Sequence, residues 1–409
     1  MNTGLEKLHP YPFEKLAQLK LETSVITDAK HIDLSIGEPK HTTPELILNE
    51  LQKQLPRAAS YPTTQGTDAL RQAIAEWLIK RFKLPDNSMT AERNILPVNG
   101  TREALFAFAQ CVIDSNSSHS NSSHSKAPIV ILPNPFYQIY EGAALLAKAE
   151  PYYINCVEAN GFLPDFDAVP EDIWQRCQLV YLCSPGNPTG AVLGHDTLGK
   201  LLKLADQYDF IIAADECYSE IYLDEDSPPT GLLQAASNLG RNDYRRCVVF
   251  HSLSKRSNVP GMRSGFVAGD GELIQTFLRY RTYHGCSMPI YTQMASIVAW
   301  QDEVGFSMYE RLVKNKEKAF FTYPSYDKYL FYQEHRKGNL DFWLPGIVYN
   351  YNIGCKYPND LNPTKYKPDY KICLFNTSHK KWAKPNETHV ELHEAKGWAN
   401  DMWNSYDRI

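Results

Sequence analysis

The chain has 409 residues, of which 43% are hydrophobic and 22% are charged, and its formal net charge is −5. This balance is typical of a soluble protein of two or three domains; it gives no reason to expect nucleic acid or a membrane as partner, and neither a membrane span nor a signal-peptide pattern occurs. The nine cysteines are scattered without CxxC pairs, so we expect a cytoplasmic protein with neither a disulfide framework nor a metal site.

Short apolar runs bounded by Pro, Gly or Asp indicate buried strands, and apolar residues at helical spacing indicate helices between them. In chain order, the pattern predicts a helix at 69–82, a helix at 105–113, strands at 127–132 and 179–183, a helix at 198–205, and strands at 210–214, 247–250 and 265–268. Asp196 is the expected cap of the helix at 198–205. The alternation predicts an α/β domain with a mainly parallel sheet covered on both faces, where ligands bind beyond the carboxyl ends of the strands.

The segment HSLSK, residues 251–255, follows a predicted strand, and Arg263 comes eight residues after the lysine. A lysine after a strand end is usually a solvated surface residue. Here, however, Ser252 and Ser254 precede Lys255. A lysine amine forms an imine with an aldehyde, and a nearby phosphate needs hydroxyl and guanidinium donors.

Asp215 closes the predicted strand at 210–214. An acidic residue is costly to bury unless it meets a cation. A protonated pyridine nitrogen is such a cation, and an aspartate partner lets the ring accept electrons. An isolated aspartate at this position would more commonly cap the next helix.

Two further motifs contain turn and helix-start signals. In SPGNPTG, residues 184–190, prolines and glycines fix a rigid turn with Asn187 at its centre, although any tight turn could look this way. In NGTREA, residues 99–104, Gly100 is followed by Thr101 and Arg102 where a helix begins. A small residue followed by polar donors at a helix N-terminus can bind an anion, although many helices begin in this way.

In this order, the four motifs resemble those of fold-type I pyridoxal-phosphate enzymes of the class I/II aminotransferase family, and the segment SLSKRSNVPGMRSG is especially specific. Tyr61, in YPTTQG, matches a family tyrosine that reaches the phosphate in the neighbouring subunit's site. Tyr137, in PFY, matches the aromatic residue that stacks on the pyridine ring. The resemblance implies a pyridoxal 5′-phosphate cofactor, amino-acid and 2-oxo-acid substrates, and a homodimer.

The resemblance also implies a domain organisation and residue roles. Residues 45–305 would form the large three-layer α/β/α domain, and 1–44 would pack with a small α+β domain at 306–409. Lys255 would form the Schiff base and carry the proton between Cα and C4′, while Asp215 would pair with the pyridine nitrogen. The remaining cofactor contacts would come from Gly100, Thr101, Arg102, Tyr137, Asn187, Tyr218, Ser252, Ser254 and Arg263, with Tyr61 arriving from the partner chain. Substrate contacts would come from Gly37 and Asn187.

Within the family, phrases such as HPYPFEKL, LSIGEP and NGFLPDFDAV resemble the proteobacterial aminotransferases that act on succinyldiaminopimelate in lysine and cell-wall precursor synthesis. After about residue 320 the resemblance ends: 321–409 contains ten tyrosines but only twelve Ile, Leu and Val residues. The family arginine that binds the substrate α-carboxylate has no match, and the nearest candidate is Lys371, which lacks the planar two-point contact. Another aminotransferase, a β-lyase of the same family, or a cofactor-binding protein impaired by its divergent C-terminus stay open as alternatives.

Overall fold

The computed structural model describes residues 3–22, 42–115, 127–222, 227–285 and 287–302. The predicted small domain at 306–409 lies outside the described residues, and so do two predicted substrate contacts, Gly37 and Lys371. The packing of the N-terminal segment against that domain therefore stays a prediction. In the described part of the N-terminal segment, Tyr11 contacts the large domain, because the Arg102 guanidinium lies 5.4 Å from the centre of its ring.

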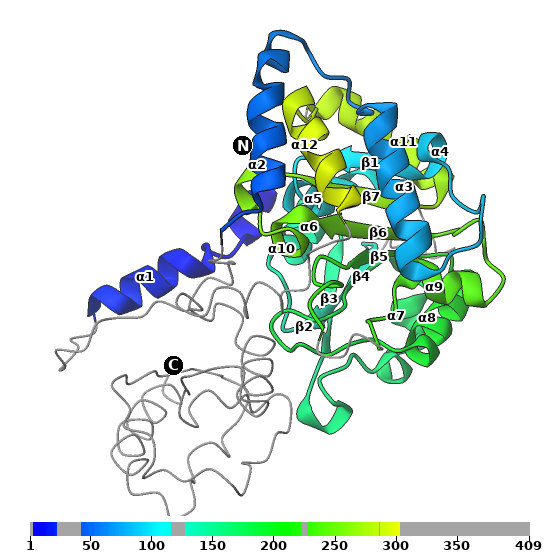
Figure 1. Cartoon of the computed structure of the whole chain (residues 1–409). Coiled ribbons are helices and arrows are strands. Elements are labelled where there is room, and N and C mark those ends of the chain that lie inside the picture. The colour runs from blue at the N-terminus through cyan, green and yellow to red at the C-terminus, as the bar shows by residue number, and fades with distance from the viewer. Residues whose placement is uncertain (1–2, 23–41, 116–126, 223–226, 286, 303–409) are drawn as a thin grey trace, which may run out of the picture. The chain divides into compact units, whose positions relative to one another are not determined.

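A seven-stranded sheet forms the centre of the described part, in the order β1-β7-β6-β5-β4-β2-β3 (Figure 1). All neighbouring pairs are parallel except those made by β7, which runs antiparallel to both β6 and β1. The strands are β1 (Ile95–Val98), β2 (Ile129–Asn134), β3 (Glu150–Asn155), β4 (Cys177–Cys183), β5 (Ile211–Asp215), β6 (Cys247–Ser252) and β7 (Gly265–Gly269). The mainly parallel α/β sheet and all five predicted strands are confirmed.

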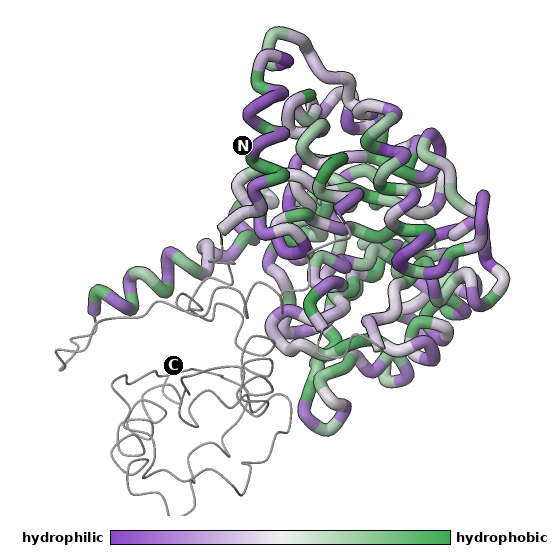
Figure 2. The backbone as a smooth tube through the Cα atoms, viewed as in Figure 1, coloured by the Kyte–Doolittle hydropathy of each residue, from purple (hydrophilic) through white to green (hydrophobic). Residues whose placement is uncertain are grey.

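Helices cover both faces of the sheet. The α-helices of the described part are α1 (Pro12–Glu22), α2 (Glu45–Gln54), α3 (Asp68–Phe82), α4 (Ala91–Asn94), α5 (Thr101–Val112), α6 (Ile139–Leu146), α7 (Glu171–Trp174), α8 (His195–Tyr208), α9 (Leu232–Asn238), α10 (Leu253–Arg256), α11 (Gly271–His284) and α12 (Ile290–Gln301). One hydrophobic core joins the sheet to α3, α8, α9 and α12, and a second core joins its other face to α5, α6 and α11. Figure 2 shows the hydrophobic residues gathered along the central strands. The three-layer architecture is therefore observed.

The predicted helix boundaries need two corrections. Asp196 does not cap its helix, because α8 begins one residue earlier, at His195, with Gly194 at the cap position. Asp196 lies in the first turn instead, where a negative charge still interacts favourably with the helix dipole. The helix predicted at 105–113 begins at Thr101, because Gly100 at φ +86° turns the chain directly into the first helical residue.

The two strands that the pattern missed, β1 and β3, are the two edges of the sheet. Each contains a proline, Pro97 in β1 and Pro151 in β3, which removes a backbone donor and weakens the sequence signal of a strand. Edge positions tolerate this loss, since one side of the strand has no neighbour to bond.

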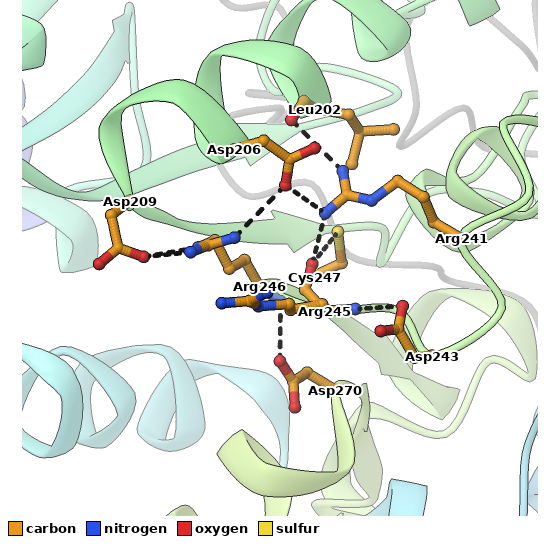
Figure 3. Close-up of polar contacts among 9 residues, drawn as sticks. All are labelled: Leu202, Asp206, Asp209, Arg241, Asp243, Arg245, Arg246, Cys247 and Asp270. Atoms are coloured by element: carbon orange, nitrogen blue, oxygen red, sulfur yellow. Dashed lines mark hydrogen bonds and ion pairs between the residues drawn. The ribbon is translucent and has the colours of Figure 1, made fainter.

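An ion-pair network lies at the amino ends of β5 and β6 (Figure 3). Asp206, on α8, pairs with Arg241 at 3.1 Å and with Arg246 at 3.3 Å, and Arg246 also pairs with Asp209. Asp270 accepts the Arg246 N–H at 2.7 Å with one oxygen and caps the start of α11 with the other. The network therefore joins the end of α8, the entry to β6 and the start of α11, at the edge opposite the predicted site.

The described helices were also compared with the length and hydropathy that a membrane span requires, and none of them meets both requirements.

Candidate active site

The predicted site residues lie where three neighbouring parallel strands end. Cys183 at the end of β4 is the register partner of Asp215 in β5, and Asp215 is the partner of Phe250 in β6. Asn187 follows β4, Asp215 is the last residue of β5, and Lys255 lies in α10 directly after β6. Topology therefore brings these three side chains to one edge of the sheet, as predicted for ligand binding in a parallel sheet.

The Asp215 side chain is buried, with 5% of the residue exposed. Its Oδ2 accepts a 2.8 Å hydrogen bond from the Tyr140 hydroxyl, and its Oδ1 accepts one from the Cys217 N–H at 3.3 Å. Burial raises the pKa of this carboxyl, although hydrogen bonds from Cys217 and Tyr140 oppose the rise. A buried carboxylate held by neutral donors is well suited to receive a cation.

Lys255 is half-buried in α10, whose N-cap is Ser252. The Ser252 hydroxyl accepts the Ser254 N–H at 3.1 Å and lies 3.4 Å from the Ser264 carbonyl, to which it donates. The predicted Ser252, Ser254 and Lys255 therefore sit on one short turn at the end of a buried strand. The cap fixes the direction in which this turn leaves the sheet.

The antiparallel strands bring the second predicted anion motif to the same place. Val98, at the end of β1, is the register partner of Gly265, which is in turn the partner of Ser252. The start of α5 therefore lies beside the serine turn. A side chain at Gly100 would overlap the guanidinium of Arg263 and come 2.9 Å from its Cζ. Gly100 and Arg263 thus lie against each other, as two parts of one predicted phosphate cradle.

Thr101 links this cradle to the aspartate. Its Oγ1 lies 3.1 Å from Sγ of Cys217, two residues beyond Asp215. The loop after β5 and the start of α5 are therefore in direct contact. Predicted phosphate donors and the predicted ring partner belong to one continuous site.

Tyr137 lies beside Arg102 and close enough to Asp215 to be affected by its charge. Burial raises the pKa of Tyr137 to about 12, with the Arg102 guanidinium opposing the rise and the Asp215 carboxylate adding to it. The Arg102 guanidinium lies 5.9 Å from the centre of the Tyr137 ring. The phenol therefore stays neutral, and its ring is held next to both a cation and the buried carboxylate.

Asn187 and Tyr218, both predicted to contact the cofactor, are also in contact with each other. The Asn187 amide donates to the Tyr218 hydroxyl at 3.3 Å. They come from the turn after β4 and the turn after β5. Tyr61, by contrast, is fully exposed in the single chain.

Two polar residues of this site were missed at the sequence level, Tyr140 and Cys217. Tyr140 is fully buried on α6, and its ring stacks on Tyr181 at a centroid distance of 4.7 Å. The available signal was a tyrosine in the mostly apolar segment IYEGAALL, residues 139–146, because a buried phenol usually has a hydrogen-bond partner. No sequence pattern, however, indicated that this partner is Asp215.

A three-layer domain whose strand ends gather a lysine, a buried aspartate and a set of hydroxyl and guanidinium donors defines the fold-type I class of transferases. The comparisons then give the family. The family model of aminotransferase class I and II matches residues 29–328, so the chain belongs to this family. The match ends near the point at which the sequence stops resembling the family.

Individual relatives agree with this assignment. The LL-diaminopimelate aminotransferase of Dehalococcoides mccartyi is 32% identical over 302 residues, which cover 73% of this chain and 72% of the relative. A crystal structure of an aminotransferase from Neisseria meningitidis is 47% identical, with a TM-score of 0.70, and the match covers 77% of each chain. The aminotransferase AspB from Helicobacter pylori is 35% identical, with a TM-score of 0.67, over 77% of this chain and 82% of that one.

Proposed function

We propose that the chain is a pyridoxal-phosphate-dependent aminotransferase that uses Lys255 as its nucleophile. The observation that carries the proposal is the placement of buried Asp215 and Lys255 at the ends of adjacent parallel strands. A lysine amine can hold the aldehyde of the cofactor, and bound cofactor supplies the electron sink for chemistry at Cα of the amino acid.

The electrostatics of Asp215 support this choice of cofactor. The raised pKa of its carboxyl means that the unliganded site disfavours a charge there. A protonated pyridine nitrogen would reverse this preference, because an opposite charge at contact distance favours the carboxylate. Tyr140 and the Cys217 N–H would hold the carboxylate in place.

The cradle beside Gly100 supports a phosphate. Arg263 lies against Gly100, so any side chain there would displace the guanidinium that would bind the anion. The hydroxyls of Thr101, Ser252 and Ser254 and the exposed guanidinium of Arg102 would add donors. Charge-assisted hydrogen bonds of this kind are short and strong, which suits tight binding of a dianion.

The remaining roles concern the ring and the partner chain. Tyr137 would cover one face of the ring, and the contacting pair Asn187 and Tyr218 would bind its hydroxyl. Lys255 would also move the proton at Cα. The fully exposed Tyr61 supports a homodimer in which this side chain completes the neighbouring site. Gly37 would lie beside the substrate carboxylate. The proposal also includes a cytoplasmic location.

For the substrate, we propose N-succinyl-LL-diaminopimelate, with 2-oxoglutarate as the acceptor. The name of the relative at 32% identity supports a diaminopimelate substrate, and the phrases at 9–16, 34–39 and 160–169 support the succinylated form. The divergent C-terminal sequence favours one alternative, a chain that binds the cofactor but turns over slowly. Lys371 in place of an arginine would bind a carboxylate through a single point.

A half-reaction experiment tests the function. Full-length protein loaded with pyridoxal 5′-phosphate is mixed with glutamate, LL-diaminopimelate or its N-succinyl form, without any 2-oxo acid. The proposal predicts a donor-dependent change in the visible absorbance of the bound cofactor, fastest with the succinylated donor and reversed by 2-oxoglutarate. Bound cofactor with no change for any donor would support the impaired alternative, and release of ammonia from a sulfur amino acid with a leaving group on Cβ, tested in place of these donors, would support a β-lyase.

A further inference from the structure

Two buried charged residues face each other directly beside the proposed site, across the ends of β5 and β6. Glu216 is 3% exposed and His251 is 2% exposed, and Nε2 of the histidine lies 3.1 Å from Oε2 of the glutamate. The β5–β6 ladder continues past Asp215, because the Glu216 N–H donates to the Phe250 carbonyl at 2.9 Å. Side chains alternate along a strand, so this pair lies on the sheet face opposite Asp215.

The surroundings of the pair are apolar. The rings of Trp77, Phe82 and Phe266 lie 5.2, 5.6 and 5.1 Å from the His251 ring. On the other side, Glu216 Oε1 accepts the Leu232 N–H at 2.7 Å. In such a low-dielectric environment a carboxylate needs nearby donors or a cation, and the His251 ring is the ionisable group that faces Glu216.

Within the described residues, a chain of polar contacts links the pair to further charged groups. His251 Nδ1 lies 3.4 Å from the Ser219 hydroxyl, which donates to Glu220, and Glu220 pairs with Arg81 on α3 at 2.8 Å. The Arg256 guanidinium stacks over Trp77 at 5.4 Å. Glu220 and Arg81 pair with each other, and Glu216 is the carboxylate that lies against the His251 ring.

We propose that Glu216 and His251 are positioning residues of the cofactor site: the pair ties the strand end that carries Asp215 to the strand end that leads into Lys255, and it helps to hold Asp215 in its ionised form. This inference rests on the proposed function, since it assumes that Asp215 must be ionised to hold the cofactor. The pair itself would not touch the cofactor.

The surroundings of Asp215 agree with the electrostatic part of the inference. Burial raises the pKa of Asp215, and the charge of His251 is among the influences that lower it, together with the hydrogen bonds from Cys217 and Tyr140. Removing that charge would raise the pKa of Asp215 further. Cofactor affinity falls at low pH as Asp215 becomes protonated, and this part of the pH profile is called the acid limb here. With a higher pKa of Asp215, the acid limb would move to higher pH.

Two variants remove the charge from opposite sides of the pair. His251→Phe fits the aromatic surroundings and deletes the cation, whereas Glu216→Gln keeps an acceptor for the Leu232 N–H but deletes the anion. The matched control is Glu220→Gln, the same exchange four residues further on, which would loosen Arg81 without touching His251. Binding of pyridoxal 5′-phosphate to the full-length apoprotein is titrated between pH 5 and 9, and thermal unfolding of the apoprotein checks that each variant folds.

The inference predicts that both variants shift the acid limb of cofactor affinity upward by about half a pH unit or more, and that the double variant shifts it no further than either single one. Glu220→Gln leaves the limb where it is. A purely structural role would lower the unfolding temperature without moving the limb, and an unmoved limb in either folded variant overturns the inference. If wild-type protein itself binds no cofactor, the proposed function fails instead.

Discussion

The hydroxyl of Tyr140 donates a 2.8 Å hydrogen bond to Oδ2 of Asp215, and both side chains are buried. The two residues come from α6 and β5, which lie 75 positions apart in the chain. This contact fixes the orientation of the carboxylate on which the proposed cofactor site depends.

Tyr140→Phe should weaken binding of pyridoxal 5′-phosphate by about tenfold, because a hydrogen bond to a charged group contributes roughly 1.5 kcal/mol. Titration of the apoprotein with the cofactor measures this. The control is Tyr181→Phe, which removes another buried hydroxyl, bonded to the Leu105 carbonyl at 2.6 Å, from the ring stacked on Tyr140. Equal losses in the two variants would show that the effect is general loosening of the core.

Asp215→Asn should make the unliganded protein more stable at neutral pH. The folded-state pKa of Asp215 is raised by burial, so the folded chain binds its proton more tightly than the unfolded chain. Stability from this group is therefore complete below about pH 4, its ordinary pKa, and is lost as pH rises through the folded value.

Thermal unfolding of apoprotein from pH 4 to 8 measures this dependence. The unfolding temperature of wild type should decline as pH rises, and the decline should be smaller in Asp215→Asn. Asp172→Asn, at an exposed carboxylate on α7, should show the same decline as wild type. A variant less stable than wild type at pH 8 would show that the Asp215 carboxylate stabilises the unliganded fold.

Gly100→Ala should reduce cofactor affinity by at least about tenfold, because the new methyl group overlaps the Arg263 guanidinium and displaces a phosphate donor. The control is Gly161→Ala: it shares the positive φ, +61° against +86°, but has open space around the added carbon. Backbone strain should cost about 1 kcal/mol of stability in Gly161→Ala and about 1–3 kcal/mol in Gly100→Ala, because Gly100 has a ψ of 153° that few other residues adopt at positive φ. Titration with pyridoxal 5′-phosphate separates them, and similar affinities would contradict the placement of the cradle.

Asp270→Ala should lower the free energy of unfolding by about 1–3 kcal/mol, because one carboxylate both caps α11 and accepts the Arg246 N–H. Asp209→Asn removes a neighbouring, largely exposed partner of Arg246 and should change stability by less than about 1 kcal/mol. Chemical unfolding of the apoprotein provides both values. A larger effect at Asp209 would mean that the exposed pair, and not the buried cap, stabilises this corner.

The strand ends that hold the site could be predicted from the sequence. An apolar run indicates a buried strand, and Asp215 or Lys255 directly after such a run indicates a functional residue at its end. Parallel topology then required these ends to meet at one edge. The edge strands β1 and β3 were missed, since Pro97 and Pro151 interrupt their patterns. Asp196 was predicted as the cap but lies two residues after it, because an acidic residue suits both the cap and the first turn.

The residues around the site were harder to predict, because their roles depend on packing between distant segments. Nothing near Tyr140 in the sequence indicates its contact with Asp215. The pairing of Glu216 with His251 likewise depends on the register between β5 and β6. Such contacts follow only once the order of the strands is known.

The most direct test of the account is to trap the cofactor on the protein. Full-length chain is incubated with pyridoxal 5′-phosphate, reduced with borohydride, digested, and analysed by mass spectrometry. The account predicts one adduct per chain, on the peptide that contains Lys255, and none in Lys255→Ala. An adduct spread over several lysines, or one that persists in the variant, would contradict the assignment of Lys255.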